Sequence, residues 1–173
     1  MTITKTLFSA VTALALSFGS FSVFAADKHD TQTLVMDIEI TGDSSVKGDK
    51  EDNLKKITHF SNHLRTELQD KTAFTIVDGD AALVATTQFQ TEENVLHCNG
   101  CEMALAEEYD AGLVMVPYVF RMSHLISTLH IEVKDVETGN VIKKKAFDFR
   151  GNTDQAWERA IRYAVRDLKD WQP

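Results

Sequence analysis

Two cysteines are the first residues in this chain that could do chemistry. They lie three positions apart in the run His97-Cys98-Asn99-Gly100-Cys101-Glu102, and the chain has no other cysteine. Two lone cysteines in an exported protein most often pair with each other. The favoured interpretation is a local Cys98–Cys101 disulfide that shapes a loop and adds about 2 kcal/mol of stability.

Thiol exchange is one alternative for the same pair. Cys98 lies near the start of a predicted helix and beside His97, and both features stabilise a thiolate. Acidic side chains at Glu92, Glu93 and Glu102 favour the neutral thiol instead. The surroundings also lack the strand and the tryptophan that introduce the cysteine pair of thioredoxin-like proteins.

Metal binding is the other alternative. Thiolate and imidazole ligands suit Zn or Cu(I), so His97, Cys98 and Cys101 could form most of a site. A closed zinc site needs a fourth ligand, and Met103 is a conceivable soft one. Glu102 stands where a haem-attachment motif has its axial histidine, which argues against covalent haem. If the two cysteines form the favoured disulfide, we expect the protein to hold no metal and no other cofactor.

Three further residues gather where the last predicted strand meets the last predicted helix. Arg150 could recognise a carboxylate, or it could pair with Asp154 and pack on Trp157. Together with His97, these three form the predicted ligand or partner surface. The sequence contains no Gly-rich phosphate loop, no nucleophile elbow and no histidine–acid pair obviously directed at a serine. We therefore predict a protein without catalytic residues.

The first 25 residues predict export to the periplasm. Lys5 precedes an uncharged apolar run from Leu7 to Phe24, and Val23-Phe24-Ala25 places small residues where a signal peptidase requires them. We expect cleavage after Ala25. No later segment is long and apolar enough to be expected to cross a membrane.

Residues 26–173 predict one domain with its own core. This part carries all 26 acidic residues and 17 of the 18 Lys and Arg residues, a formal net charge of −9. Because no basic stripe is present, the balance argues against a general nucleic-acid binder and against adhesion to an anionic membrane.

Periodicity predicts an α/β sandwich, a mixed sheet of about five strands covered by helices. Alternation and continuous apolar runs predict strands, and apolar residues at helical spacing predict helices. The order implies a parallel first pair and an antiparallel C-terminal meander. Pro117 predicts a bulge or an edge. The expected strands are 33–40, 73–77, 113–116, 125–136 and 141–149, and the expected helices are 54–68, 81–89, 102–109 and one that begins at Asn152 or Thr153.

Three motifs resemble a family of secreted bacterial proteins of unknown function. The resemblance covers nearly all of residues 26–173. The motifs are Cys98-Asn99-Gly100-Cys101-Glu102, Ser123-His124-Leu125-Ile126, and Arg150-Gly151-Asn152-Thr153-Asp154 with Trp157. More distantly, Asp110-Ala111-Gly112-Leu113-Val114-Met115-Val116 and Asp135-Val136-Glu137-Thr138-Gly139 are similar to the small α/β domain of the TolB N-terminus and of CsgG-type lipoproteins. Neither resemblance implies a reaction.

Together these observations predict a non-catalytic periplasmic accessory or binding protein of a bacterial envelope system. Its expected partner is another envelope protein, and the oligomeric state stays open. The alternative is a thiol-redox or Cu/Zn-handling protein that acts through His97, Cys98 and Cys101. The family resemblance associates that alternative with periplasmic quinoprotein oxidation.

Overall fold

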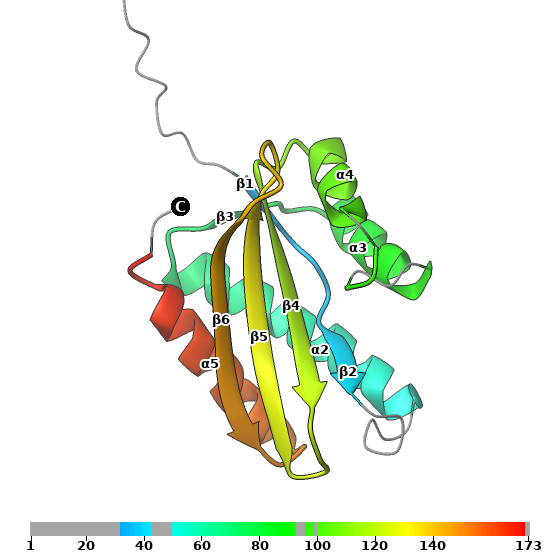
Figure 1. Ribbon diagram of the computed structural model, residues 1–173, viewed down its shortest axis with the longest axis vertical. Helices are drawn as coiled ribbons and strands as arrows, with labels where there is room; N and C mark the ends of the chain where they lie inside the picture. The colour runs from blue at the N-terminus through cyan, green and yellow to red at the C-terminus, as the bar shows by residue number, and fades with distance from the viewer. Residues whose placement is uncertain (1–31, 43–49, 93–95, 99, 172–173) are drawn as a thin grey trace, which may run out of the picture.

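A six-stranded mixed sheet organises the chain in the computed structural model (Figure 1). The structure describes residues 32–42, 50–92, 96–98 and 100–171, so the predicted signal peptide at 1–25 lies outside the described residues. The strands are β1 (Gln32–Val35), β2 (Glu39–Gly42), β3 (Thr75–Ile76), β4 (Leu113–Arg121), β5 (Ile126–Asp135) and β6 (Val141–Arg150).

The sheet has the order β3-β1-β4-β5-β6, and β2 also pairs with β4. β1 runs parallel to β3 and to the first half of β4, whereas β2 runs parallel to the second half of β4. β4, β5 and β6 form an antiparallel meander. The predicted mixed sheet, with its parallel first pair and C-terminal meander, is confirmed. It has one strand more than the five expected, because the predicted strand 33–40 is divided.

Four helices of the described part cover the two sheet faces unequally (Figure 1). One face packs against α2 (Lys50–Lys71) and α5 (Asp154–Leu168), which lie behind the sheet in this view. The shorter helices α3 (Asp80–Glu92) and α4 (Cys101–Glu108) lie beside β1 and the start of β4. No described helix covers the near face of β5 and β6. None of the four combines the length and apolar character that crossing a bilayer requires.

The larger hydrophobic core lies between the sheet and the helix pair α2–α5. Thr153 caps α5, because its hydroxyl accepts from the Ala156 amide at 3.3 Å. The apolar face of α5 then enters this core, where Trp157 stacks on Phe60 with 5.0 Å between ring centroids. A smaller core lies beneath α3 and α4.

The predicted strand 33–40 is interrupted at residues 36–38. Val35 pairs with Met115 before the interruption, and Glu39 pairs with Tyr118 after it. The segment from Val35 to Glu39 therefore has one residue more than the segment of β4 beside it. The interruption is therefore equivalent to a bulge.

The extra residue reverses the alternation of side chains. Val35 and Ile38 are three positions apart, yet both lie in the core beneath α2 and α5. Pro117 lies in β4 at the same level and has no N–H to donate to a neighbouring strand. Pro117 predicts a bulge or an edge, and the structure has a bulge at residues 36–38, between β1 and β2, which lie beside β4.

Side chains from α2 pair the backbone groups that this break frees. Arg65 donates from Nε and Nη2 to the Val35 carbonyl oxygen, at 3.1 and 2.7 Å. The hydroxyl of Ser61 accepts from the Ile38 amide at 2.8 Å. Arg65 also forms an ion pair of 2.6 Å with Asp37, and their side chains are only 10% and 4% exposed.

Helix α3 is attached to the same point. Arg65 donates to the Thr86 hydroxyl at 3.2 Å, and the Thr87 hydroxyl donates to the second carboxylate oxygen of Asp37 at 2.8 Å. The buried ion pair therefore connects the sheet, α2 and α3, and all its strong hydrogen-bonding groups have partners.

We expect Arg65→Met to lower the free energy of unfolding by about 3–5 kcal/mol, because it leaves the Asp37 carboxylate buried without its cation. Urea denaturation of the purified protein measures this change. Lys55→Met is the matched control on the same helix, since Lys55 forms only an exposed pair with Glu51 and should cost less than about 1 kcal/mol. Equal losses in the two variants would contradict a special role for the buried pair.

Candidate functional site

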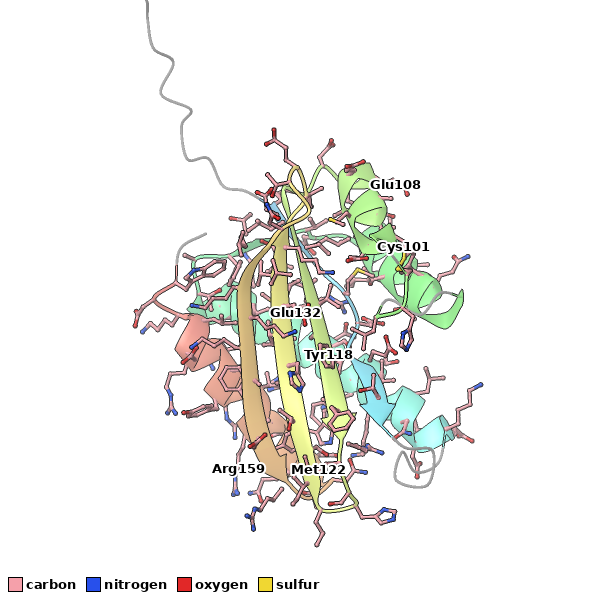
Figure 2. The ribbon with its side chains drawn as sticks, viewed as in Figure 1. Cys101, Glu108, Tyr118, Met122, Glu132 and Arg159 are labelled. Carbon is pink, nitrogen blue, oxygen red and sulfur yellow. A yellow bond between two sulfur atoms is a disulfide. The ribbon has the colours of Figure 1, made fainter. Side chains whose placement is uncertain are left out.

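The uncovered sheet face carries an aromatic pair at its centre. Tyr118 of β4 lies opposite His130 of β5, and their rings stack with centroids 4.5 Å apart and an interplanar angle of 6°. Figure 2 shows Tyr118 and Glu132 in the middle of the near face, where no described helix covers them. The pair therefore offers a half-buried aromatic surface to a ligand.

Polar side chains around this pair already bind one another. Glu132 forms an ion pair of 2.6 Å with Lys144 of β6, and the Tyr118 hydroxyl lies 3.5 Å from the same carboxylate. Two residues before His130 on β5, the Thr128 hydroxyl donates to Asp148 of β6 at 2.7 Å. These cross-strand pairs leave a surface on which the charges are largely neutralised.

Both rings of the aromatic pair are uncharged at neutral pH. Burial raises the pKa of the Tyr118 phenol, and the charge of Glu132 adds to this effect. Burial lowers the pKa of the His130 imidazole, and the nearby Lys144 lowers it further. The Nδ1 atom of His130 is buried and has no hydrogen-bond partner among the described residues, so a proton there would be poorly solvated.

An apolar tip adjoins this face at the turn between β4 and β5. We use this name for Phe120, Met122, Leu125 and Ile126, whose side chains are 39%, 63%, 71% and 38% exposed. The Ser123 hydroxyl accepts from the amides of Leu125 and Ile126, at 3.3 and 3.1 Å, and this fixes the turn. Met122 marks the tip at the lower end of the sheet in Figure 2.

The structure joins Cys98 and Cys101 by the expected disulfide. Helix α4 begins at Cys101, one residue before the expected start at Glu102, and Gly100 before it has a φ of 89° that favours glycine. Glu102 follows and is fully buried, where it forms an ion pair of 2.5 Å with Lys134 of β5. The ion pair fastens the start of α4 to the meander, and the disulfide closes the short loop before the helix.

The proposed metal ligands do not form one group. Donor atoms of Cys98, Cys101 and Glu102 lie within 4.8 Å of one another, but His97 does not belong to this group. Met103 packs against the β5–β6 turn, with its sulfur 3.6 Å from where a Gly139 Cβ would lie. Because both sulfurs are in the disulfide, the thiolates that the metal alternative requires are not present in this arrangement.

The motif from Arg150 to Trp157 forms the corner between β6 and α5. The side-chain oxygen of Asn152 accepts from the Trp157 indole at 3.0 Å and from the buried Arg121 at 2.9 Å. Asp154 forms an ion pair of 2.6 Å with Lys56 of α2. Several residues of the motif thus have structural partners.

The predicted ligand or partner surface is divided between two places. Trp157 is 2% exposed, and Asp154 is paired with α2. Arg150 is exposed and lies opposite Ile126, so it adjoins the apolar tip. His97 is exposed beside the disulfide, which lies toward the other end of the sheet (Figure 2).

Sequence reasoning missed the Tyr118–His130 pair and the apolar tip. The alternation in 125–136 indicated an outer face with His130 and Glu132 on it, but it could not show that no helix covers that face. A signal for the tip was present as well, because Met122 is an apolar residue between two expected strands and Leu125 begins the second of them.

Comparison with known proteins identifies a family and similar folds. A family model described as "Protein of unknown function (DUF2380)" matches residues 31–168. No curated protein matches the sequence. Among solved structures, the LpoB C-terminal domain from Salmonella enterica is 16% identical with a TM-score of 0.50, over 69% of this chain and 82% of that chain.

Two other solved structures are similar at lower scores. The PelC dodecamer from Paraburkholderia phytofirmans is 15% identical with a TM-score of 0.46, over 84% of this chain and 91% of that chain. Lipoprotein GNA1162 from Neisseria meningitidis is 10% identical with a TM-score of 0.49, over 83% and 99%. At these identities the likeness concerns the fold alone, and the resemblance to TolB and CsgG stays a prediction.

We expect Lys134→Met to destabilise the protein more than Cys98→Ser combined with Cys101→Ser. The first change leaves Glu102 buried without a cation and should cost about 3 kcal/mol or more. The second removes only a short covalent loop and should cost about 2 kcal/mol or less. Urea denaturation compares them, and Glu102→Met with Lys134→Met should recover part of the loss. A larger loss in the cysteine variant would contradict this order.

The His130 imidazole should make the folded protein less stable in acid. Its pKa is lower in the folded protein than the ordinary value of about 6.5, so below that pH the unfolded chain binds more protons. Its effect on stability is absent well above pH 6.5 and grows as the pH falls toward the folded pKa. Tyr118, Glu132, Lys144 and Asp148 are the titratable groups around it.

Urea midpoints at pH 7.5, 6.5 and 5.5 measure this effect. We expect the wild-type protein to lose more stability than His130→Gln over this range, while the other histidines contribute equally to both proteins. Parallel pH profiles would contradict a depressed pKa at His130.

Proposed function

The chain belongs to the family described as "Protein of unknown function (DUF2380)", and we propose that it is a non-catalytic binding protein of the bacterial envelope. Residues 1–25 would export it to the periplasm, and residues 26–173 would act as one domain. The observation that carries this proposal is the uncovered sheet face with its exposed apolar tip.

The apolar tip supports binding because its exposure contributes nothing to folding. Phe120 and Ile126 lie diagonally on neighbouring strands, and Met122 and Leu125 project from the turn that joins those strands. Contiguous exposed apolar side chains of this kind mark interaction sites. Complete burial of a fully exposed side chain of this kind contributes about 1.5–3 kcal/mol, and Met122 and Leu125 are the two with the most surface left to bury.

The partner we propose is a folded protein that has an apolar pocket for the tip. Aromatic and methionine side chains are enriched at the centres of protein interfaces, and the face offers Tyr118, Phe120 and Met122 together. Its charges at Glu132 and Lys144 are already paired, so a partner can cover them without leaving either charge unpaired. The net charge of −8 disfavours an anionic membrane as the occupant.

Site-specific photocrosslinking tests the proposal in the cells that make the protein. A photoreactive amino acid replaces Leu125 or Tyr118 in separate variants, and Val84 in the control. Val84 is an apolar residue on α3 whose exposure, 64%, is close to the 71% of Leu125. We expect Leu125 and Tyr118 to yield adducts with the same protein, and Val84 to yield none.

The crosslinked protein is then purified and its affinity is measured by calorimetry. We expect Leu125→Asp to weaken binding at least tenfold, because a buried carboxylate replaces an apolar anchor, whereas Val84→Asp should change binding less than twofold. Adducts with a second copy of the chain alone, binding to lipid vesicles alone, or equal effects of the two aspartate variants would overturn the proposal.

A further inference from the structure

A cationic groove lies between α2 and α5, on the sheet face opposite the aromatic pair. Its volume is about 630 Å³. Figure 2 shows Arg159 on the α5 side of the molecule, away from Tyr118 and Glu132. Five cationic side chains line the groove, and they are Lys71 of α2, Arg159, Arg162 and Arg166 of α5, and Lys169 at the C-cap of α5.

The groove is basic in a protein that is acidic as a whole. The chain has a formal net charge of −8, but the groove lining has five cations against two acids, Glu67 and Asp70. A net positive cavity on an acidic protein concentrates anions locally, whereas the remaining surface repels them. This contrast indicates a ligand with several negative charges.

Several of these cations are not held by a carboxylate of the described residues. The guanidinium of Arg166 lies 4.8 Å from the Tyr163 ring rather than in an ion pair. Within the described residues, Arg159 and Lys169 form no ion pair. Lys71 pairs with Glu67, and Arg162 pairs with Glu158 at 3.3 Å on the exposed surface. At least three cations are therefore available to a ligand.

The spacing of the cations matches an extended peptide. Arg162 and Arg166 are four residues apart on one helix, about 6 Å along its axis, and Lys169 follows about 4.5 Å further on. Alternate side chains of an extended chain are about 6.6 Å apart. Carboxylates at every second position of such a chain can therefore reach successive cations, and arginine binds a carboxylate through two parallel hydrogen bonds.

We propose that this groove binds an acidic, extended segment of a partner polypeptide. A flat membrane cannot place several phosphates inside a groove between two helices. A polymer that carries its charges on the backbone, such as a polyphosphate, would also bring them against the carboxylates of Glu67 and Asp70 on the α2 wall. A peptide carries its charges on side chains, so it can direct them to α5 and its backbone amides to α2. The site is independent of the apolar tip, so the two surfaces can hold different partners on opposite faces.

Fluorescence anisotropy with a labelled octaglutamate peptide tests this inference on the purified protein. We expect saturable binding at 20 mM salt that weakens at 150 mM salt, because the contacts are ionic and partly exposed. Arg159→Glu combined with Arg166→Glu should weaken binding at least tenfold. Lys50→Glu combined with Lys55→Glu makes the same change in net charge elsewhere on the surface, and it should change binding less than twofold.

Further measurements distinguish binding in this groove from binding at the apolar tip and from a general effect of charge. Leu125→Asp should leave octaglutamate binding unchanged, so that failure of the tip proposal and failure of the groove proposal are distinguishable. Equal losses in the two double variants would show an effect of net charge alone and overturn the inference. If the groove binds tripolyphosphate or phosphatidylglycerol vesicles but not octaglutamate, a peptide is not the ligand and the inference is overturned. The absence of any binding would overturn it as well.

Discussion

The guanidinium of Arg65 stands at the point where the first predicted strand breaks. It pairs the carbonyl that the break frees at Val35 and neutralises the buried carboxylate of Asp37. Without these contacts the break would bury an unpaired acceptor and an unpaired charge, and each is costly in an apolar interior. Arg65 also donates to the Thr86 hydroxyl and Asp37 accepts from the Thr87 hydroxyl, so the ion pair also fixes where α3 lies.

The position of α3 and α4 has a consequence for the whole surface. Because these helices are held beside β1 and the first half of β4, the remainder of that sheet face has no cover from any described helix. The strands there pair their polar side chains across the sheet, as Glu132 does with Lys144. The opposite face packs against α2 and α5, and the cationic groove lies between these two helices.

Two of the motifs behind the family resemblance have structural roles. The cysteine motif closes a disulfide and buries Glu102 against Lys134, and the corner motif uses Asn152 to join Arg121 and Trp157. These residues use their polar groups within the protein. The turn motif differs, because Ser123 only fixes the turn and Leu125 projects 71% of its surface into solvent. This difference is the reason that the binding proposal concerns the turn rather than the cysteines.

The sequence by itself determined the order and type of most elements, because burial of one face imposes a period of two on strands and 3.6 on helices. It also favoured the disulfide, since two lone cysteines in an exported protein most often pair, and the structure joins them. Only the tertiary structure decided which face of 125–136 is covered and where the strand break lies. The cationic groove also depends on the tertiary structure. After Ala25 the sequence has 17 Lys and Arg residues against 26 acidic residues, which predicts an acidic surface, but the packing of α5 beside α2 gathers five cations around one cavity. Which residues of different helices and strands become neighbours depends on how these elements pack, and the local periodicity of the sequence does not encode this packing.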